Sequence, residues 1–316
     1  MSEVVVYIRS QPQFGDQIVA FPALYQLKSW WSSNRITVVA RDDVGDIYRA
    51  LPWVNEFVRA TTFSDYVRSL KKETRVSVCL HHSSERYGLA NLLRRPAVRL
   101  GFLNARISDR VWTHCHRKDT AEYIGLANLR LLASYQPVDA EPTMRQCFQA
   151  LAARDLQTTP SSDVVMIPGG GSGAFKRWSL AHYLGLVDRL KGLLGRDARY
   201  LFVLGPQEEQ ERATLEAMRR PDISIAYRRS IPELSAIMLQ ARLVVANDCG
   251  PSHIAQSACV PYVGVFNAPN PEWFWSRPYS AAVVPQHHRD GINSITPDDV
   301  FGACRGVMPH APSYLS

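Results

Sequence analysis

Residues 243–257 read LVVANDCGPSHIAQS, which is an apolar segment, a polar turn and the start of a helix. The apolar segment Leu243–Ala246 has the length and composition of a buried strand. Pro251 suits the first turn of a helix, because the N–H that proline lacks has no intrahelical partner there. The amides and the dipole at a helix start favour an anion. The segment therefore predicts a strand–turn–helix unit with an anion site, although a turn in which Asp248 only caps the helix has the same pattern.

The same alternation of strand and helix extends through both halves of the chain. Strands are expected at 4–8, 36–40, 57–58 and 76–80 in the first half, and at 164–167, 200–204, 223–226, 243–246 and 262–266 in the second. A long helix is expected over 18–31. Strands that alternate with helices indicate a parallel, doubly wound sheet, and 316 residues are enough for two domains. We therefore expect an α/β protein with two Rossmann-like domains that face a central cleft, where ligands bind outside the carboxyl ends of the strands.

A proline-containing, polar stretch separates the two halves. It runs from residue 134 to residue 160 and includes Pro137, Pro142 and Pro160. We place the domain boundary in this stretch, with a first domain over 1–157 and a second over 158–294. The remaining segment, 295–316, is predicted to form a terminal helix that packs back on the first domain.

Positive charge is concentrated in the first half. The chain has 36 basic and 29 acidic residues, and the segment from Tyr66 to Lys118 holds twelve Lys or Arg residues, among them Arg94 and Arg95, against three acidic ones. Such an excess suits an anionic partner, for which nucleic acid, an anionic membrane face and a phosphorylated glycolipid are all options. A solvated helix face is the alternative without a partner. No RRM, KH or zinc-finger signature supports nucleic acid.

Several classes of protein are disfavoured by composition. No apolar run approaches the ~20 residues that span a bilayer, and the chain opens on a strand-like segment instead of a signal peptide, so we expect a cytoplasmic protein. The six cysteines are scattered and should be reduced thiols. His114-Cys115-His116 cannot direct three adjacent side chains at one ion, and no other ligand cluster has zinc spacing. We therefore expect no metal site.

A second anion-suited loop follows the strand at 164–167. Residues 167–178 read IPGGGSGAFKRW, in which consecutive glycines allow backbone amides to surround an anion. Lys176 and Arg177 follow at a distance suited to a diphosphate. The loop is not a P-loop, because the G-x-x-x-x-G-K-[ST] pattern is absent. Two such loops in one half point to a nucleotide diphosphate more strongly than either does alone.

The first strand leads into a loop that carries one carboxylate. Residues 9–16 read RSQPQFGD, so that Asp16 lies just before a helix. A helix N-terminus favours the charged form of a carboxylate, which suits a general base. The alternative is that Asp16 caps the helix.

Taken in order, these segments resemble glycosyltransferase family 9, the ADP-heptose:lipopolysaccharide heptosyltransferases. The resemblance covers most of the chain outside 66–150, and Asp248-x-Gly250-Pro251-x-His253 is its most specific part. The other segments that carry it are Gln13–Asp16 with Phe21–Leu24, Pro52–Val58, Lys176–Trp178, Leu204–Pro206 with Glu208–Glu209, and Phe266–Pro271.

The resemblance implies a GT-B architecture, with the donor in the C-terminal domain and the acceptor mainly in the N-terminal one. It implies inverting sugar transfer, in which Asp16 deprotonates the acceptor hydroxyl and Lys176 stabilises the charge that grows on the departing ADP. Donor-binding residues would be Gly170, Gly171, Glu208, Glu209, Asp248, Cys249, Gly250, Pro251 and His253, with Glu209 or Glu208 on the ribose. Acceptor-binding residues would be Arg9, Gln13, Gly15, Arg94 and Arg95.

The resemblance further implies ADP-heptose as donor and no cofactor. An anionic glycolipid acceptor at the cytoplasmic face of the inner membrane fits the basic segment. Since no D-x-D motif is present to bind a metal ion, we expect metal-independent transfer. Three segments depart from the family pattern: Gln11–Gln13, Cys249 and Asn267–Pro271. They leave open a different sugar or a protein or capsule acceptor. A non-catalytic nucleotide- or nucleic-acid-binding protein is the remaining alternative.

Overall fold

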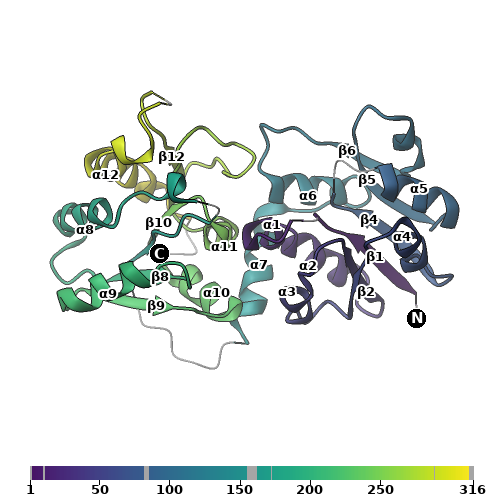
Figure 1. The fold of residues 1–316 in the computed structure, drawn as a ribbon, viewed down its shortest axis with the longest axis horizontal. Helices are drawn as coiled ribbons and strands as arrows, with labels where there is room; N and C mark the ends of the chain where they lie inside the picture. Colours follow the sequence, from purple (N-terminus) through teal and green to yellow (C-terminus); the bar gives the residue numbers. More distant parts are fainter. Residues whose placement is uncertain are drawn as a thin grey trace. The chain divides into compact units, whose positions relative to one another are not determined.

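The computed structural model describes residues 2–9, 11–81, 85–154, 162–171, 173–287 and 289–312. They form two compact units, Met1–Thr143 and Met144–Ser316 (Figure 1). The division falls inside helix α7 (Ala140–Ala152), most of which belongs to the second unit. The boundary predicted near residue 157 lies outside the described residues.

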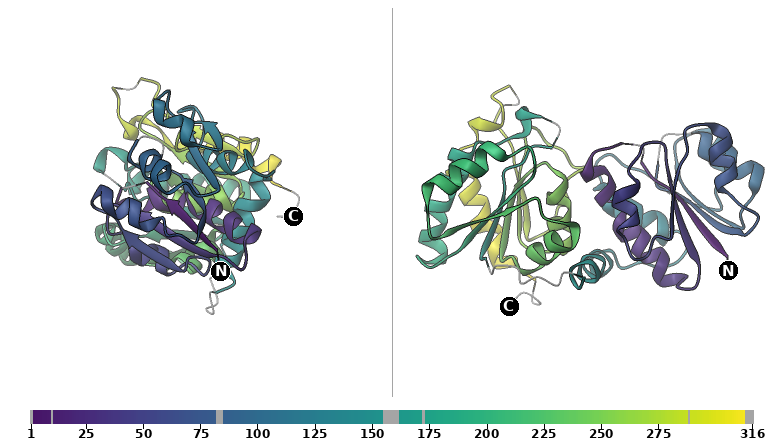
Figure 2. Two further views of the ribbon diagram at one scale, coloured as in Figure 1. Left: turned by 90° about the vertical axis from the view of Figure 1, so that its right-hand side faces the viewer. Right: turned by 60° about the horizontal axis from the view of Figure 1, so that its bottom comes forward.

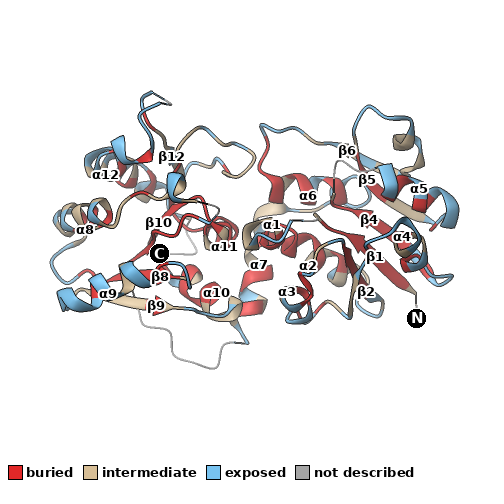
Figure 3. Ribbon diagram, in the orientation of Figure 1, coloured by how far each residue is buried: buried red, intermediate tan, exposed pale blue. Residues whose placement is uncertain are grey.

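The first unit is built on a six-stranded parallel sheet with the order β3-β2-β1-β4-β5-β6. Its strands are β1 (Glu3–Tyr7), β2 (Arg35–Ala40), β3 (Glu56–Arg59), β4 (Thr74–Cys79), β5 (Val98–Leu103) and β6 (His114–Arg117). Its helices are α1 (Phe14–Ile18), α2 (Phe21–Trp30), α3 (Gly45–Arg49), α4 (Phe63–Ser69), α5 (Glu85–Arg94), the short η1 (Ile107–Val111) and α6 (Ile124–Ala133). The central strands are buried, as Figure 3 shows.

The long helix expected over 18–31 is α2, which begins at Phe21 and ends at Trp30. A separate short helix, α1, precedes it and ends at Ile18. Pro22 occupies the first turn of α2, where its missing N–H is tolerated, but in a continuous helix it would remove a hydrogen bond and clash with the preceding turn. The proline therefore separates the short helix that carries Asp16 from the longer one behind it.

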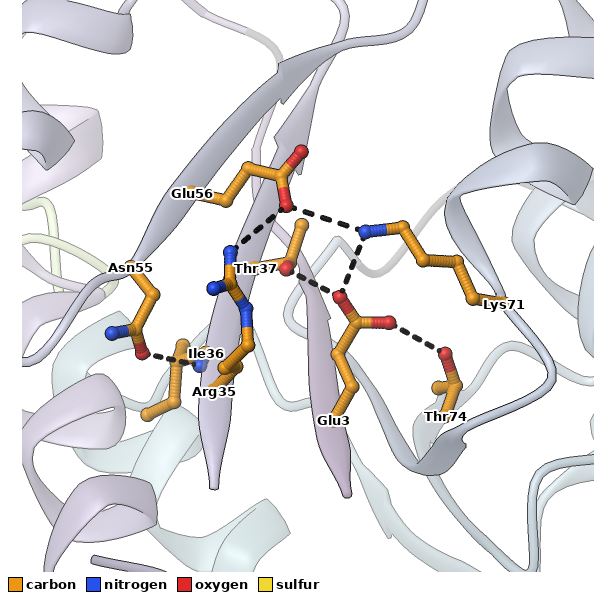
Figure 4. A network of polar contacts seen from close by, with 8 residues as sticks. All are labelled: Glu3, Arg35, Ile36, Thr37, Asn55, Glu56, Lys71 and Thr74. Carbon is orange, nitrogen blue, oxygen red and sulfur yellow. Dashed lines mark hydrogen bonds and ion pairs between the residues drawn. The ribbon is translucent and has the colours of Figure 1, made fainter. Parts of the chain in front are cut away.

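A buried carboxylate network closes the amino end of the first sheet (Figure 4). Glu3 is 2% exposed and accepts hydrogen bonds from Thr37 at 2.8 Å and Thr74 at 2.9 Å. Lys71 lies 3.3 Å from both Glu3 and Glu56. Since ligands bind at the opposite, carboxyl end of such sheets, this network has a structural role. It leaves the site to the loops at the other end.

The second unit repeats the architecture with the strand order β12-β11-β10-β7-β8-β9, again all parallel. Its strands are β7 (Val164–Ile167), β8 (Tyr200–Leu204), β9 (Ile223–Tyr227), β10 (Leu243–Asn247), β11 (Tyr262–Val265) and β12 (Ser280–Val283). Its helices are α8 (Leu180–Leu194), α9 (Glu209–Met218), α10 (Ile231–Gln240), α11 (Gly250–Ala258) and α12 (Pro297–Val307), with short η2 (Ala174–Lys176), η3 (Ile292–Ser294) and η4 (Met308–His310). Helices cover both faces of each sheet (Figure 2).

The C-terminal helix α12 belongs to the second unit. It packs on α8, β11 and β12, and Val300, Cys304 and Val307 enter the core beneath them. The prediction that 295–316 packs back on the first domain is corrected by these contacts. The cause is the apolar face of α12, which completes the core that α8 covers. Residues 313–316 lie outside the described part of the chain.

Each sheet has one point where the chain reverses its direction of winding. In the first unit this point lies between β1 and β4, and in the second between β7 and β10. The loops that leave two such strands diverge to opposite faces and open a crevice at the carboxyl ends, where ligands of doubly wound sheets bind. The loop after β1 carries Asp16, and the loops after β7 and β10 carry Lys176 and Asp248.

Candidate functional site

The structure joins the two anion-suited loops of the second unit through one ion pair. Lys176 Nζ donates to Asp248 Oδ2 at 2.6 Å. The Asp248 side chain is only 9% exposed and that of Lys176 is 23% exposed, so the pair is largely buried but part of the lysine side chain is accessible. Because the two residues follow β7 and β10, the pair lies at the point where the sheet reverses its winding. The pair therefore holds a cation at the place where the two loops meet.

Asn247, which the sequence analysis did not select, holds the two loops together. Its side chain is buried, and Nδ2 donates to the carbonyl of Pro168 at 2.7 Å. The Tyr183 hydroxyl lies 3.0 Å from Asn247 Oδ1 and 3.1 Å from the carbonyl of Ile167, so its single hydrogen serves one of these oxygens at a time. The end of β10 is thus tied to the end of β7. A buried Asn at the last position of an apolar strand was the available signal.

Replacing Asn247 with alanine should lower the free energy of unfolding by about 1–3 kcal/mol, because the buried carbonyl of Pro168 loses its donor. Urea unfolding of the two proteins measures the difference. Gln210→Ala, at an exposed amide side chain of the same unit, is the control and should have a smaller effect. Equal losses for the two variants would show that Asn247 does not tie the loops together.

The glycines of the first loop are required by close packing. Gly171 has φ +51°, a left-handed conformation that favours glycine, and a Cβ there would lie 3.6 Å from the carbonyl oxygen of Asp248. A Cβ on Gly170 would lie 2.3 Å from Arg177 Cγ and 2.9 Å from the carbonyl of Gly173. The loop therefore lies directly against the β10 loop and the Arg177 stem. Ser172, between these glycines, lies outside the described residues.

The two adjacent glutamates after β8 have different surroundings. Glu208 is 6% exposed, accepts from the amide of Gly205 at 2.9 Å and pairs with Arg177 at 3.3 Å. Glu209 is exposed at the start of α9 and forms an ion pair with Arg212. Hydrogen bonding from Arg212 and then from Tyr227 lowers the pKa of Glu209 below its usual value. Glu208 is therefore engaged inside the protein, whereas the carboxylate of Glu209 faces solvent.

Helix α11 begins at the second loop, with Cys249 as its N-cap and Gly250 and Pro251 as its first residues. The Cys249 side chain makes no capping hydrogen bond, and burial raises the pKa of its thiol to about 12, so it is neutral. Ser252 Oγ donates to the carbonyl of Cys249 at 2.7 Å. Since Pro251 has no N–H, it fixes the helix start without offering a donor. Gly250 supplies an amide at the first helical position.

His253 is the fourth residue of α11, and it is only 2% exposed. Burial is the main cause that lowers its pKa to about 4; nearby Lys176 also lowers it, while Asp248 opposes the shift. Its ring packs 5.3 Å from that of Trp273, and its Nδ1 lies 3.3 Å from Gln256 Nε2. His253 is therefore neutral at pH 7, and its buried ring packs the first turn of α11 against Trp273.

The buried His253 should make the protein less stable in mild acid. Between pH 6.5 and about 4 the unfolded chain binds a proton at this residue that the folded protein does not. Stability is therefore lost as the pH falls through this window, by about 3 kcal/mol for this group. Urea unfolding of the protein and of His253→Gln at pH 7 and pH 4.5 measures the contribution. A pH dependence of the same steepness in both proteins would contradict it.

In the first unit, Asp16 is not the helix cap. The N-cap of α1 is Gln13, whose side chain makes no capping hydrogen bond, and Gly15 and Asp16 lie in the first turn. Asp16 Oδ1 pairs with Arg9 Nε at 3.1 Å, and its side chain is 15% exposed. The alternative interpretation of Asp16 as an N-cap is therefore wrong, and Arg9, Gln13, Gly15 and Asp16 lie on one short loop-and-helix segment.

His81 also lies at this reversal point, since it follows β4, the strand beside β1. Burial first, and then Arg9 and Lys118, lower the pKa of His81 to about 4, so the ring is neutral at pH 7. The sequence analysis did not select His81. Its position directly after an apolar strand was the signal that could have selected it.

A sequence comparison identifies the family. The model of glycosyltransferase family 9 (heptosyltransferase) matches residues 84–289. The chain belongs to this family. A curated relative, lipopolysaccharide heptosyltransferase 3 of Escherichia coli K12, is 25% identical over 195 residues, which are 55% of this chain and 53% of that protein. The chain thus matches about half the length of this relative.

Solved structures of family 9 confirm the fold. A glycosyltransferase family 9 protein from Veillonella parvula is 16% identical, with a TM-score of 0.66 over 98% of both chains. The E. coli heptosyltransferase WaaC with ADP is 15% identical, with a TM-score of 0.68 over 97% of this chain and 99% of that one. The predicted α/β class, two doubly wound domains of the GT-B type, is confirmed.

Two of the predicted acceptor residues of this family 9 chain lie away from Asp16. Arg94 and Arg95 are at the C-terminal end of α5, which returns the chain from the carboxyl end of β4 to the amino end of β5. The two arginines donate to the carbonyls of Val67 and Leu92. They are therefore at the opposite end of the sheet from the loop of Asp16. Charge clustering along the sequence does not reveal which end of a sheet a residue occupies.

The described residues contain neither a metal-ligand cluster nor a membrane-spanning helix. No group of three His, Cys, Asp or Glu side chains there could hold a metal ion. Within the same part of the chain, no helix is both long and apolar enough to cross a membrane.

Proposed function

We propose that this family 9 glycosyltransferase moves a heptose from ADP-heptose to an anionic lipopolysaccharide inner-core acceptor, with inversion and without a metal ion. The observation that carries the proposal is the Lys176–Asp248 pair at the reversal point of the second sheet, between the glycine loop and the start of α11. Family membership supports sugar transfer, and the heptosyltransferase relative supports the donor and acceptor class.

In this proposal the second unit binds the donor through its diphosphate. The amides of the glycine loop and of Gly250 would hold the phosphate oxygens, and Asp248 would keep the Lys176 ammonium group directed at them. As the bond from the anomeric carbon to the diphosphate breaks, its electron pair passes to the phosphate oxygen. A fixed cation and fixed amides stabilise this growing charge without reorganisation. The solvent-facing carboxylate of Glu209 would accept hydrogen bonds from the ribose.

The first unit would bind the acceptor beside Asp16. The acceptor oxygen attacks the anomeric carbon from the side opposite the diphosphate, which inverts the configuration, and Asp16 takes up the hydroxyl proton. Arg9, at 3.1 Å, fixes the orientation of this carboxylate. Proton transfer to a positioned carboxylate contributes about 10²–10⁴-fold to such a reaction. The reaction would take place at the cytoplasmic face of the inner membrane.

The direct test incubates the protein with ADP-heptose and a truncated lipopolysaccharide in the presence of a chelator, and follows ADP release. The proposal predicts release that depends on the acceptor and continues without metal. Release only after a divalent cation is added would contradict the metal-independent mechanism. No release with any lipopolysaccharide acceptor would contradict the acceptor class.

The second candidate function is transfer of a different sugar, or transfer to a different acceptor. It is favoured by the segments Gln11–Gln13 and Asn267–Pro271, which depart from the family pattern beside the proposed base and after β11. Thermal shift across a panel of nucleotide sugars separates the candidates on the donor side. Stabilisation by ADP-heptose alone supports the first candidate, and stabilisation by another nucleotide sugar supports the second.

A further inference from the structure

A groove of about 810 Å³ lies between α5 and η1, and none of its lining residues belongs to the segment 9–16 that carries Asp16. The two elements pack closely, since a Cβ on Gly88 would lie 3.2 Å from Ser108 Cβ. Leu89, Leu92 and Ile107 line the groove together with Arg95 and Arg110. None of these five side chains has a role in the proposed sugar transfer, since Arg95, which the resemblance implied as an acceptor residue, lies at the opposite end of the sheet from Asp16.

The apolar side chains along this groove are exposed. Leu89, Leu92 and Leu93 are 48%, 47% and 59% exposed, and Ile107 is 85% exposed. On its other face α5 buries Tyr87 and Ala90 against the first unit, so the helix is apolar on two sides. Figure 3 shows much of α5 as exposed surface. Contiguous exposed apolar side chains of this kind indicate a surface that meets another apolar phase.

The charges around these side chains are mostly positive, because Arg86, Arg95, Arg99 and Arg110 line the groove against one carboxylate, that of Glu85. Four exposed arginines on this surface have no ion pair with a carboxylate among the described residues, namely Arg94, Arg95, Arg106 and Arg110. The nearby carboxylate of Asp109 binds backbone amides instead of these arginine side chains: its Oδ2 accepts from the amides of Asn104 at 2.8 Å and Arg106 at 3.1 Å. Exposed leucines beside unpaired arginines are typical of an element that lies in the interface of an anionic bilayer.

We propose that α5 and η1 form a docking surface for an anionic lipid bilayer. Leu92, Leu93 and Ile107 enter the acyl boundary, and the surrounding arginines contact lipid phosphates. A small soluble anion would leave the leucines exposed, and an acidic protein would leave the apolar groove unfilled, so the bilayer suits both parts of the surface. This docking surface rests on the proposed function in one respect: an enzyme whose acceptor lies in a membrane needs a surface that contacts the membrane.

The test is cosedimentation of the full chain with vesicles of phosphatidylcholine, with and without phosphatidylglycerol. We expect binding that requires phosphatidylglycerol and weakens with salt. The double variant Leu93→Gln with Ile107→Gln should lose most of this binding. The variant Arg106→Gln with Arg110→Gln should bind about thirtyfold more weakly, as expected when two arginines leave an anionic surface.

Matched controls come from the second unit. Leu193 and Met218 are 41% and 44% exposed, so Leu193→Gln with Met218→Gln also replaces two exposed apolar side chains and should leave vesicle binding unchanged. Equal binding by the α5–η1 variants and these controls would overturn the proposal. So would light scattering that shows a dimer dissociating in Leu93→Gln with Ile107→Gln, because a second copy would then cover the surface. The assay contains no sugar donor, so its failure is distinguishable from failure of the proposed transfer reaction.

Discussion

Replacing Lys176 with alanine should lower kcat by about 10²–10³-fold, the effect expected when one fixed group that stabilises developing charge is removed. In the proposed reaction the diphosphate gains charge as the bond to the anomeric carbon breaks, and the ammonium group of Lys176 is held by Asp248 at the loops proposed to bind that diphosphate. The KM for ADP-heptose should rise less than kcat falls, because the interaction strengthens as the charge develops. Steady-state ADP release measures both constants.

The control for this variant is another lysine–carboxylate pair in the same unit. Lys191 on α8 lies 2.9 Å from Asp222, and both residues are outside the loops at the reversal point. Lys191→Ala should leave kcat within about twofold, because Lys191 lies outside the loops proposed to bind the diphosphate. The loss of stability should also be small, since surface ion pairs contribute about 0–1 kcal/mol. Thermal melts of both variants show whether each is folded at the assay temperature. Equal losses of kcat in the two folded variants would contradict the role of Lys176.

Replacing Asp16 with asparagine should lower kcat by about 10²–10⁴-fold, the range for removal of a general base. Asparagine keeps the size of the side chain and a hydrogen-bonding oxygen near Arg9, but it cannot take up the acceptor proton. The affinity for ADP, measured by calorimetry, should be unchanged because the donor is assigned to the second unit. Asp16→Asn therefore separates chemistry from donor binding.

Asp46 offers the matched control for Asp16. It also lies in the first turn of a five-residue helix, α3, and pairs with an arginine, Arg49, at 2.9 Å. Its side chain is fully exposed. Asp46→Asn should turn over at the rate of the unaltered protein. An Asp16→Asn protein that is folded and as active as Asp46→Asn would remove Asp16 from the mechanism.

The local hydrophobic pattern predicted the central strands, because their apolar composition is visible in the sequence itself. Runs such as Val4–Ile8 and Leu243–Ala246 are apolar enough to be central strands, and both are buried in parallel sheets. Edge strands carry a weaker signal because one side is exposed. The edge strand β6 reads HCHR, which no hydrophobic pattern marks as a strand, and its pairing with β5 is set by tertiary structure.

The position of each loop after a strand indicated which loops lie together. It did not indicate the contacts that each side chain makes within them. The glycine loop and the Asp248–His253 segment were selected from their local pattern and from the family resemblance, and the structure brings Lys176 and Asp248 together. The contribution of Asn247 depends on a hydrogen bond to a residue 79 positions away. Likewise, only the direction of the crossover through α5 shows that Arg94 and Arg95 lie at the opposite end of the sheet from Asp16.

The account depends on a diphosphate bound at the reversal point of the second sheet, and a crystal structure of the protein with ADP tests this most directly. We predict phosphate oxygens within about 2.7–3.2 Å of Lys176 Nζ and of the Gly250 amide, the range of direct hydrogen bonds. The glycine loop should surround the same phosphates. A diphosphate bound elsewhere, with Lys176 in contact with Asp248 alone, would contradict the account.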